Sequence, residues 1–452
     1  MTALRRVAQS TAAFLGSTLA RAAIGFALAL VIGRGLGADR FGEWVLCTTW
    51  ASLLTVVADL GFGVLLTRDG ARAGAPVDRL VAGALVARLS IAVPLAAALT
   101  VGAAWIVPDH GSTTALRVAA LLGVVSAAYG CFSAVLVSQP RWLPIVLGID
   151  TAWLAIQLAA SWWITAVSRG LAAPKLAGIQ ASEGGSGGLV GFGSVGGVVV
   201  ALIVLAALVQ VAQIATALIL WRRVFPDHRA RSSPRESLRS LLRRALPFAG
   251  AGIVANLDLR AAPLLLGALS TPAAVGLYAA ASRFGRLAVL APQALFGGAL
   301  PVLSGEFERD PAGTMRVFRT LDRALLAFSG SIAMACIALG PLLLRVAFGP
   351  SFVAAAPTLI WIGIGLIPSL TNAAREIALY AAGGEAAVVR WTGTALVVQV
   401  LSAAMLIPIL GSTGAAIAVF VGEAAVWLPL RRAASGRDPG KASRLVETQA
   451  RA

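Results

Sequence analysis

The chain has 452 residues, of which 58% are hydrophobic and only 13% are charged, and its mean hydropathy is +0.85. A soluble domain carries about 25% charged residues, so this composition excludes a soluble protein and indicates a polytopic membrane protein. The formal net charge is +17, but the basic residues flank apolar runs, where the positive-inside rule explains them better than nucleic-acid binding does.

The apolar runs are long and do not alternate with polar residues, which favours membrane-spanning helices over the strands of a barrel. We therefore expect an all-α fold with about twelve such helices, each long enough for the hydrocarbon core. In chain order the predicted helices are residues 11–33, 43–67, 80–106, 115–138, 143–166, 190–221, 246–269, 273–303, 324–347, 353–381, 388–410 and 411–431.

The loops between these helices predict the orientation of the chain. With the N-terminus in the cytoplasm, most arginines and lysines fall in cytoplasmic loops, and only Arg34, Arg40, Arg169 and Lys175 fall outside. Such an asymmetry sets the topology of membrane proteins, so we expect both termini to be cytoplasmic.

The two halves of the chain share a sequence pattern. Residues 42–66 match residues 276–300 at several glycine, aromatic and leucine positions, in one register without a gap. Duplicated halves are typical of transporters, whose site lies near the membrane midplane between the repeats. The predicted parts are a six-helix bundle at 1–221, a basic cytoplasmic linker at 222–245, a pseudo-repeated six-helix bundle at 246–431 and a disordered cytoplasmic tail at 432–452.

Charged residues inside the predicted helices are the informative ones, because an arginine at the centre of a membrane costs about 2.5–3.5 kcal/mol. Arginines outnumber carboxylates there, and two of them, three positions apart, share one helix face. Guanidinium groups bind phosphate oxygens in a bidentate manner, so the excess predicts a cationic cavity for an anionic substrate. The predicted substrate-binding residues are Arg21, Arg260, Arg283 and Arg286, with Arg88 and Arg375 as weaker candidates.

Three carboxylates are candidates for ion coupling or for pairing with these arginines: Asp59, Asp258 and Glu423. Internal ion pairs that only tie helices together are the alternative, for instance Arg21 with Asp258 or Arg260 with Glu423. Both histidines fall in predicted loops and the three cysteines fall in apolar runs, where buried thiols are expected. We therefore expect no metal, no cofactor and no catalytic site.

Short motifs in the first half resemble a known family. RGLGADRFG at 34–42 and ADLGFG at 58–63, with Arg68 and Arg72 beyond, are similar to the opening of oligosaccharide-lipid flippases. These are the O-antigen and exopolysaccharide translocases of the multidrug/oligosaccharidyl-lipid/polysaccharide exporter (MOP) superfamily. In the second half LPF at 246–248, VGLYAA at 275–280, ALPVLS at 299–304 and the segments 339–341 and 348–349 resemble its seventh to ninth helices.

The resemblance implies a transporter of the bacterial cytoplasmic membrane. It implies two six-helix bundles around a cationic cavity that flips a polyprenyl-pyrophosphate-linked oligosaccharide from the inner to the outer leaflet, by alternating access, for polysaccharide biosynthesis. The expected partners are that substrate, anionic membrane lipid near the basic linker, and polysaccharide polymerase and assembly proteins, without nucleic acid.

Three alternatives stay open. A multidrug or metabolite antiporter of the same superfamily would need an acidic, aromatic cavity, and the arginine excess argues against it. A membrane glycan polymerase or ligase would need acids or histidines near a membrane surface, and the largest predicted outer loop offers only Glu183. A lipid II-type flippase fits the sequence equally well.

Overall fold

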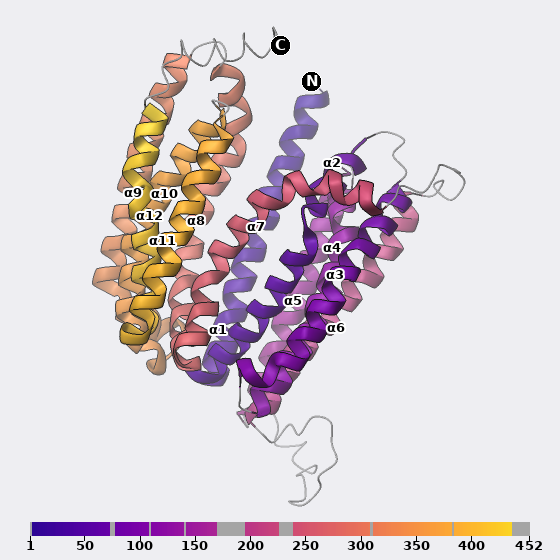
Figure 1. The fold of residues 1–452 in the computed structure, drawn as a ribbon, viewed down its shortest axis with the longest axis vertical. Coiled ribbons are helices and arrows are strands. Elements are labelled where there is room, and N and C mark those ends of the chain that lie inside the picture. The colour runs from indigo at the N-terminus through magenta and orange to yellow at the C-terminus, as the bar shows by residue number, and fades with distance from the viewer. Residues whose placement is uncertain are drawn as a thin grey trace, which may run out of the picture. The chain divides into compact units, whose positions relative to one another are not determined.

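The computed structural model describes residues 2–72, 77–107, 110–139, 142–169, 195–225, 238–307, 311–381 and 384–435. These residues form helices and no strand, as predicted, and they divide into two compact units, Met1–Arg260 and Ala261–Ala452 (Figure 1). Because the unit boundary lies within a helix, the predicted domain limits at 221 and 246 stay predictions.

The first unit consists of helices α1 to α6 and most of α7. Their bounds are Thr2–Asp59 for α1, Phe62–Gly70 for α2, Val77–Ile106 for α3, His110–Val137 for α4, Leu143–Ser168 for α5, Val195–Val224 for α6 and Leu238–Leu269 for α7. Helix α4 packs against α1, α3 and α6, and α1 also packs against α5. A Cβ atom at Gly123 of α4 would lie 2.9 Å from the carbonyl oxygen of Ala51, so this glycine permits the close approach of α4 and α1.

Two breaks interrupt the first part of the chain. Gly37 has φ 75° and ψ 177° and divides α1 into two arms, residues 2–36 and 38–59. Leu60 and Gly61, with φ 40° and 81°, then end α1, and α2 begins at Phe62. The predicted helix at 43–67 is therefore wrong as one continuous element, because two consecutive residues with positive φ cannot continue an α-helix.

The second unit holds the end of α7 and all the later helices. Their bounds are Pro272–Phe307 for α8, Pro311–Ala347 for α9, Pro350–Ala355 for the short 3₁₀ helix η3, Ala356–Ala381 for α10, Glu385–Leu410 for α11 and Ser412–Ser435 for α12. Helix α10 is the centre of this unit, since it packs against α8, α9 and α12, and α11 packs against α12.

Three helices begin well before their predicted starts. Helix α1 begins at Thr2, α7 at Leu238 and α9 at Pro311, whereas the sequence predicts starts at 11, 246 and 324. The extra turns each contain two or more arginines, which favour helix formation but make these turns too polar to count as part of an apolar span. Helix α7 therefore begins inside the segment that the sequence predicts as a linker.

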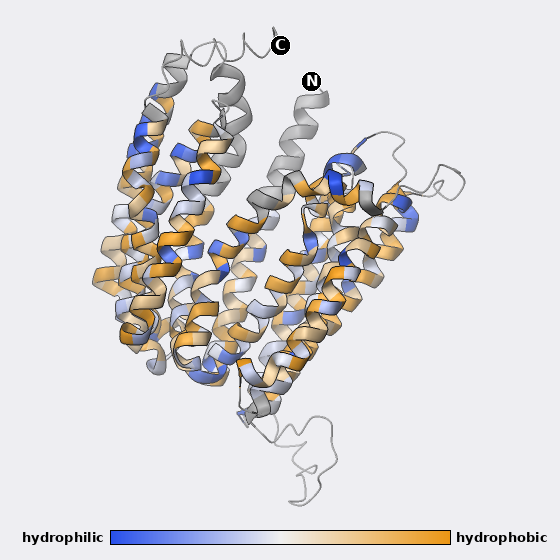
Figure 2. Cartoon of the chain, viewed as in Figure 1, coloured by the Kyte–Doolittle hydropathy of each residue, from blue (hydrophilic) through white to orange (hydrophobic). Residues whose placement is uncertain are grey.

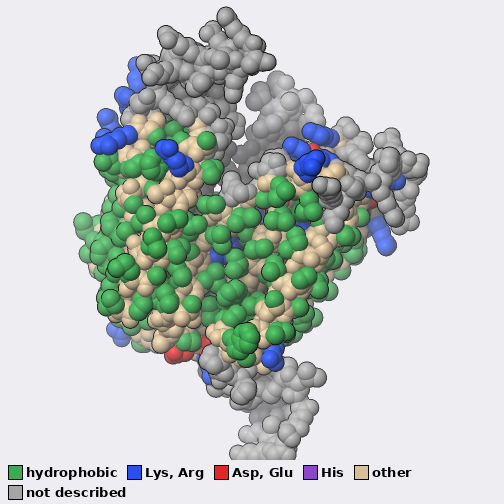
Figure 3. Space-filling model, viewed as in Figure 1, with side chains coloured by type: hydrophobic (Ala, Val, Ile, Leu, Met, Phe, Trp, Pro, Cys, Tyr) green, Lys and Arg blue, Asp and Glu red, His purple; other side chains and the backbone are tan. Residues whose placement is uncertain are grey.

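The outward faces of the helices are apolar. On α11, Val397, Leu401, Met405 and Ile409 recur every fourth residue, and Ile409 is 78% exposed. Hydrophobic residues predominate along the helices in Figure 2, and hydrophobic side chains cover much of the visible surface in Figure 3. A soluble protein rarely exposes apolar patches of this size, whereas a bilayer solvates them.

Among the described residues nine helices are long and apolar enough to cross a membrane, with both arms of α1 counted as one. The all-α polytopic fold is thus confirmed, and the chain is a multi-pass membrane protein. The exact count of twelve and the cytoplasmic placement of the termini stay predictions. The three cysteines are free and buried, as the sequence predicts.

Candidate functional site

The predicted site residues are distributed over both units. The first unit contains Arg21, Asp59, Arg88, Asp258 and Arg260, and the second contains Arg283, Arg286, Arg375 and Glu423. The contacts of these residues within each unit show which charges are neutralised by an ion pair and which are not.

Asp59 and Arg88 form a buried ion pair in the first unit. Nη2 of Arg88 binds Oδ1 of Asp59, and the Arg88 side chain is only 4% exposed, against 34% for Asp59. Nη1 of Arg88 also donates to the carbonyl oxygen of Ala127, at 3.3 Å, and the amide of Gly63 donates to Asp59 Oδ1, at 3.1 Å. The pair therefore links the end of α1 to α2, α3 and α4.

Arg21 lies near a second carboxylate that the sequence placed only at a helix end. The hydroxyl of Tyr129 on α4 donates a hydrogen bond to Oδ1 of Asp150 on α5. The positive charge of Arg21 on α1 acts on both of these groups. The predicted pairing of Arg21 with Asp258 stays a prediction, and the sequence signal for Asp150 was its position within an apolar helix.

Arg260 on α7 is held by neutral groups. Its Nε donates to Oγ of Ser52, at 2.9 Å, and its Nη1 donates to Oδ1 and the carbonyl oxygen of Asn256, at 2.8 and 3.0 Å. Within the described part of the chain no carboxylate forms an ion pair with Arg260. Asp258, two residues earlier on the same helix, is partly buried.

Arg283 and Arg286 lie three residues apart on α8 and act on each other as like charges. Arg283 is partly buried, and its Nε is a buried atom that has no hydrogen-bond partner in the described residues. Arg286 is exposed. Neither guanidinium forms an ion pair with a described carboxylate, so the repulsion between them is not neutralised there.

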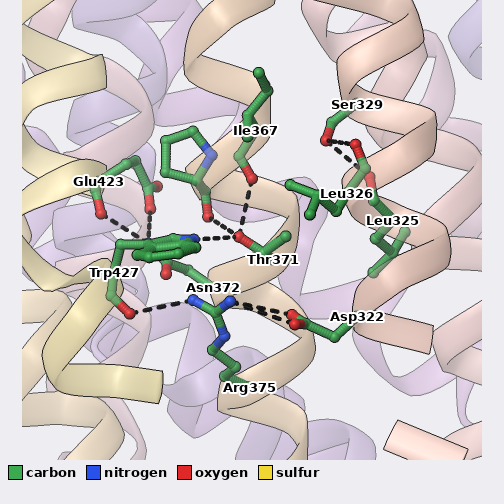
Figure 4. A network of polar contacts seen from close by, with 11 residues as sticks. Asp322, Leu325, Leu326, Ser329, Ile367, Thr371, Asn372, Arg375, Glu423 and Trp427 are labelled. Carbon is green, nitrogen blue, oxygen red and sulfur yellow. Dashed lines mark hydrogen bonds and ion pairs between the residues drawn. The ribbon is translucent and has the colours of Figure 1, made fainter. Parts of the chain in front are cut away.

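Arg375, by contrast, belongs to a polar network of the second unit (Figure 4). Its Nη2 lies 3.3 Å from Oδ1 of Asp322 on α9, and its Nη1 donates to the carbonyl oxygen of Trp427 on α12, at 3.1 Å. The guanidinium carbon is 4.7 Å from the centroid of the Trp427 ring, within the range of a cation–π contact. Nε1 of Trp427 in turn donates to Oγ1 of Thr371, at 2.9 Å.

Glu423 lies in the same network and has a definite partner. Nδ2 of Asn372 donates to Oε2 of Glu423, at 2.8 Å, and to its carbonyl oxygen, at 2.9 Å (Figure 4). Asn372 is only 2% exposed, and its Oδ1 has no partner among the described residues. The contact ties α10 to α12, four residues after Pro368, a proline inside α10.

Replacing Glu423 by glutamine tests whether its charge matters. The glutamine oxygen can still accept from Asn372, so we expect the midpoint of thermal unfolding to move by less than about 2 °C, which corresponds to less than about 1 kcal/mol. Glu423→Leu removes the side-chain acceptor and leaves the Asn372 amide only the backbone carbonyl oxygen of residue 423, and we expect a loss of about 1–3 kcal/mol. Thermal unfolding of the purified protein in detergent measures both, and equal losses in the two variants would show that the negative charge itself stabilises the unit.

Several partners could not be identified from the sequence. Tyr129, Asp322, Asn372 and Trp427 each lie on a different helix from the charge they contact, and nothing in their spacing along the chain relates them to it. The sequence could reveal only that arginines outnumber carboxylates inside the apolar helices. Of the four central arginines, Arg260, Arg283 and Arg286 form no ion pair with a described carboxylate, and the last two are neighbours on α8.

No family model matches this sequence, and no curated protein matches it. Solved structures do match. The chain is similar to the inward-facing conformation of a multidrug resistance MATE family transporter of the MOP superfamily, with 14% identity and a TM-score of 0.64, over 95% of this chain and 96% of that chain.

Two further structures share the fold. The lipid II flippase MurJ in an inward closed conformation matches with 12% identity and a TM-score of 0.66, over 92% of this chain and 85% of that one. A MOP superfamily transporter from Pyrococcus furiosus, described as having a binding pocket of reverse polarity, matches with 12% identity and a TM-score of 0.57, over 94% and 95%. At these identities the likeness shows the fold: the chain has the fold of MOP superfamily transporters.

Proposed function

We propose that the chain is a flippase that binds a polyprenyl-pyrophosphate-linked oligosaccharide and moves it across the bacterial cytoplasmic membrane by alternating access. The observation that carries the proposal is the pair of neighbouring guanidinium groups on α8, Arg283 and Arg286, without a described carboxylate partner. A membrane protein retains such a pair at a considerable energetic cost, and an anionic ligand offsets that cost.

A pyrophosphate suits this pair chemically. Residues three apart on a helix have Cβ atoms about 5–6 Å apart, so both guanidinium groups can reach oxygens of the same diphosphate. Each can donate two parallel hydrogen bonds to one phosphate group, which a lysine cannot do. Arg260 and Arg21 are further candidates, whereas the ion pairs of Arg88 and Arg375 favour structural roles for those two.

The multidrug antiporter is the second candidate, and the likeness to a MATE transporter favours it. Such a protein would take up cations, which acidic groups attract and guanidinium groups repel. Among the carboxylates proposed for ion coupling, Asp59 pairs with Arg88 and Glu423 accepts a hydrogen bond from Asn372. The uncompensated charges on α8 therefore support an anionic cargo over a cationic one.

Polysaccharide polymerase and assembly proteins remain proposed partners of the flippase.

Neutralising the α8 pair tests the proposal directly. We expect Arg283→Gln together with Arg286→Gln to lower the affinity of the purified protein for undecaprenyl pyrophosphate by at least about tenfold, because charge-assisted hydrogen bonds contribute about 1.5–3 kcal/mol each. Binding of neutral undecaprenol should not change. Arg→Lys at both positions should restore the charge but only part of the affinity.

The chain offers a matched control. Arg316 and Arg319 on α9 are also three residues apart, and both are exposed. Arg316→Gln with Arg319→Gln removes the same charge from the same unit, so it measures the general electrostatic effect. If the two double variants lose affinity equally, or if the α8 variant binds a lipophilic cation more tightly while pyrophosphate binding is unchanged, the flippase proposal is wrong.

A further inference from the structure

Three arginines converge on one buried carboxylate in the first unit. The side chain of Asp69, near the end of α2, is 4% exposed. Its Oδ1 accepts a hydrogen bond from Nε of Arg68, at 3.0 Å, and lies 3.4 Å from Nη1 of Arg72. Its Oδ2 accepts a hydrogen bond from Nη2 of Arg244 on α7. These four residues are called the Asp69 cluster below.

Apolar packing fixes the geometry of this cluster. Leu241 and Ala245, in the first turns of α7, are buried in a hydrophobic core with residues of α2, α3 and α4. Leu241 fits closely against Gly83 of α3, where a Cβ atom would lie 2.5 Å from Leu241 Cδ1. Because Leu241 and Ala245 flank Arg244 in the sequence and are docked on α2, α3 and α4, these contacts place Arg244 beside Asp69.

The Asp69 cluster carries a net positive charge that faces outward. Three guanidinium groups meet one carboxylate, and the arginine side chains are 47%, 66% and 37% exposed for Arg68, Arg72 and Arg244. The nearby acid on α3, Asp78, accepts a hydrogen bond from Nε1 of Trp221, at 2.7 Å. Figure 3 shows basic side chains gathered at this end of the first unit, beside α2.

The cluster lies at the ends of two candidate membrane spans. Residues 38–59 of α1 lead along the apolar part of the unit to α2, and α3 starts the next candidate membrane span at Val77. The short helix α2 thus lies where two consecutive apolar helices end, at the end predicted to face the cytoplasm. Anionic phospholipids of that leaflet attract basic residues close to the bilayer surface.

We propose that Arg68, Arg72 and Arg244 form a binding site for the headgroup phosphates of an anionic phospholipid, with Asp69 holding the three guanidinium groups in position. The excess of two positive charges is matched by a lipid that carries two phosphates, such as cardiolipin, or by two molecules of phosphatidylglycerol. The bound lipid fastens α2 and the first turns of α7 to the membrane surface. The proposal does not depend on the identity of the transported cargo.

A comparison of two double variants tests the site. Arg68→Gln with Arg72→Gln removes two charges from the cluster, and Arg222→Gln with Arg223→Gln removes two exposed charges from the end of α6 in the same unit. We expect the first to weaken cardiolipin binding to the purified full-length protein by about thirtyfold, the effect of two interfacial arginines, and the second by less than about threefold. Native mass spectrometry counts the bound lipids, with zwitterionic phosphatidylcholine as the neutral reference.

Replacing Asp69 by asparagine separates a fixed site from diffuse attraction. The substitution raises the net charge of the cluster by one, because it removes the carboxylate, but it also removes the group that orients the arginines. A fixed site predicts weaker cardiolipin binding, whereas diffuse attraction predicts tighter binding. If Asp69→Asn does not fold, as thermal unfolding in detergent would show, the two double variants decide alone.

Three results would overturn the proposal. The first is an equal loss of cardiolipin in both double variants, and the second is tighter binding by a folded Asp69→Asn protein. The third is displacement of the bound phospholipid by one equivalent of undecaprenyl pyrophosphate, which would assign the cluster to the cargo. Failure of the Arg283 and Arg286 experiment leaves this assignment intact, because the residues and the lipids measured are different.

Discussion

Asp59→Ala is expected to destabilise the first unit by about 3–5 kcal/mol, which is the usual cost of removing one partner of a buried ion pair. The Arg88 side chain is 4% exposed, and the substitution removes the one carboxylate that pairs with it in the described residues. The carbonyl oxygen of Ala127 remains as an acceptor, but it is neutral and does not compensate the charge. The loss should be larger than that of an exposed ion pair, which contributes about 0–1 kcal/mol.

Thermal unfolding in detergent measures this loss, and a second substitution identifies its cause. In Asp59→Ala with Arg88→Leu no charge is left buried, so we expect most of the stability to return. The pair of Arg40 with Glu43 provides the control, because the Arg40 side chain is 30% exposed and Glu43→Ala should therefore cost less. If Asp59→Ala unfolds at the same temperature as the unmodified protein, the pair does not stabilise the unit.

Gly422→Ala is expected to destabilise the second unit by about 2–3 kcal/mol, in the upper part of the range for overpacking. A Cβ atom at Gly422 on α12 would lie 2.8 Å from the carbonyl oxygen of Ala395 and 2.9 Å from Cβ of Gln399, both on α11. Since backbone atoms and a Cβ cannot rotate away, the two helices must separate. In a membrane, where packing drives helix association, that separation removes much of the contact between them.

The matched control lies on α11 itself. Gly393 has open space where its Cβ atom would be, so Gly393→Ala adds the same methyl group without a collision. We expect it to leave the midpoint unchanged or to raise it, because alanine favours helix by about 1 kcal/mol over glycine. Equal effects of the two substitutions on thermal unfolding would mean that the close approach at Gly422 is relaxed at no cost.

Most of the fold was predictable because apolar length and helix period are local properties of the sequence. The predicted ends of the helices at 80–106 and 388–410 agree closely with α3 and α11. The break at Gly37 falls in the predicted gap between residues 33 and 43. The break at Leu60–Gly61 was not predictable, since a glycine in an apolar helix is tolerated as often as it breaks the helix. The early starts of α1, α7 and α9 lie in stretches too polar for an apolar span, so the hydropathy pattern does not include them.

Only the positive charge of the candidate site could be predicted from the sequence. An excess of arginine in the apolar helices was visible, and it led to Arg283 and Arg286, which no described carboxylate neutralises. The partners of Asp59 and Glu423 depend on which faces of different helices meet, and that is set by packing. The Asp69 cluster was equally invisible, because Arg244 is brought to Asp69 by the docking of Leu241 and Ala245.

The course of α7 constrains how the gene can be divided. This helix runs without interruption from Leu238 to Leu269, while the first unit ends at Arg260. A fragment that started at residue 261 would begin in the middle of a helix and leave backbone N–H groups without acceptors in hydrocarbon. If the two halves are expressed as separate chains, the division should therefore lie between Val224 and Leu238, so that the C-terminal chain keeps the whole of α7 as its first helix.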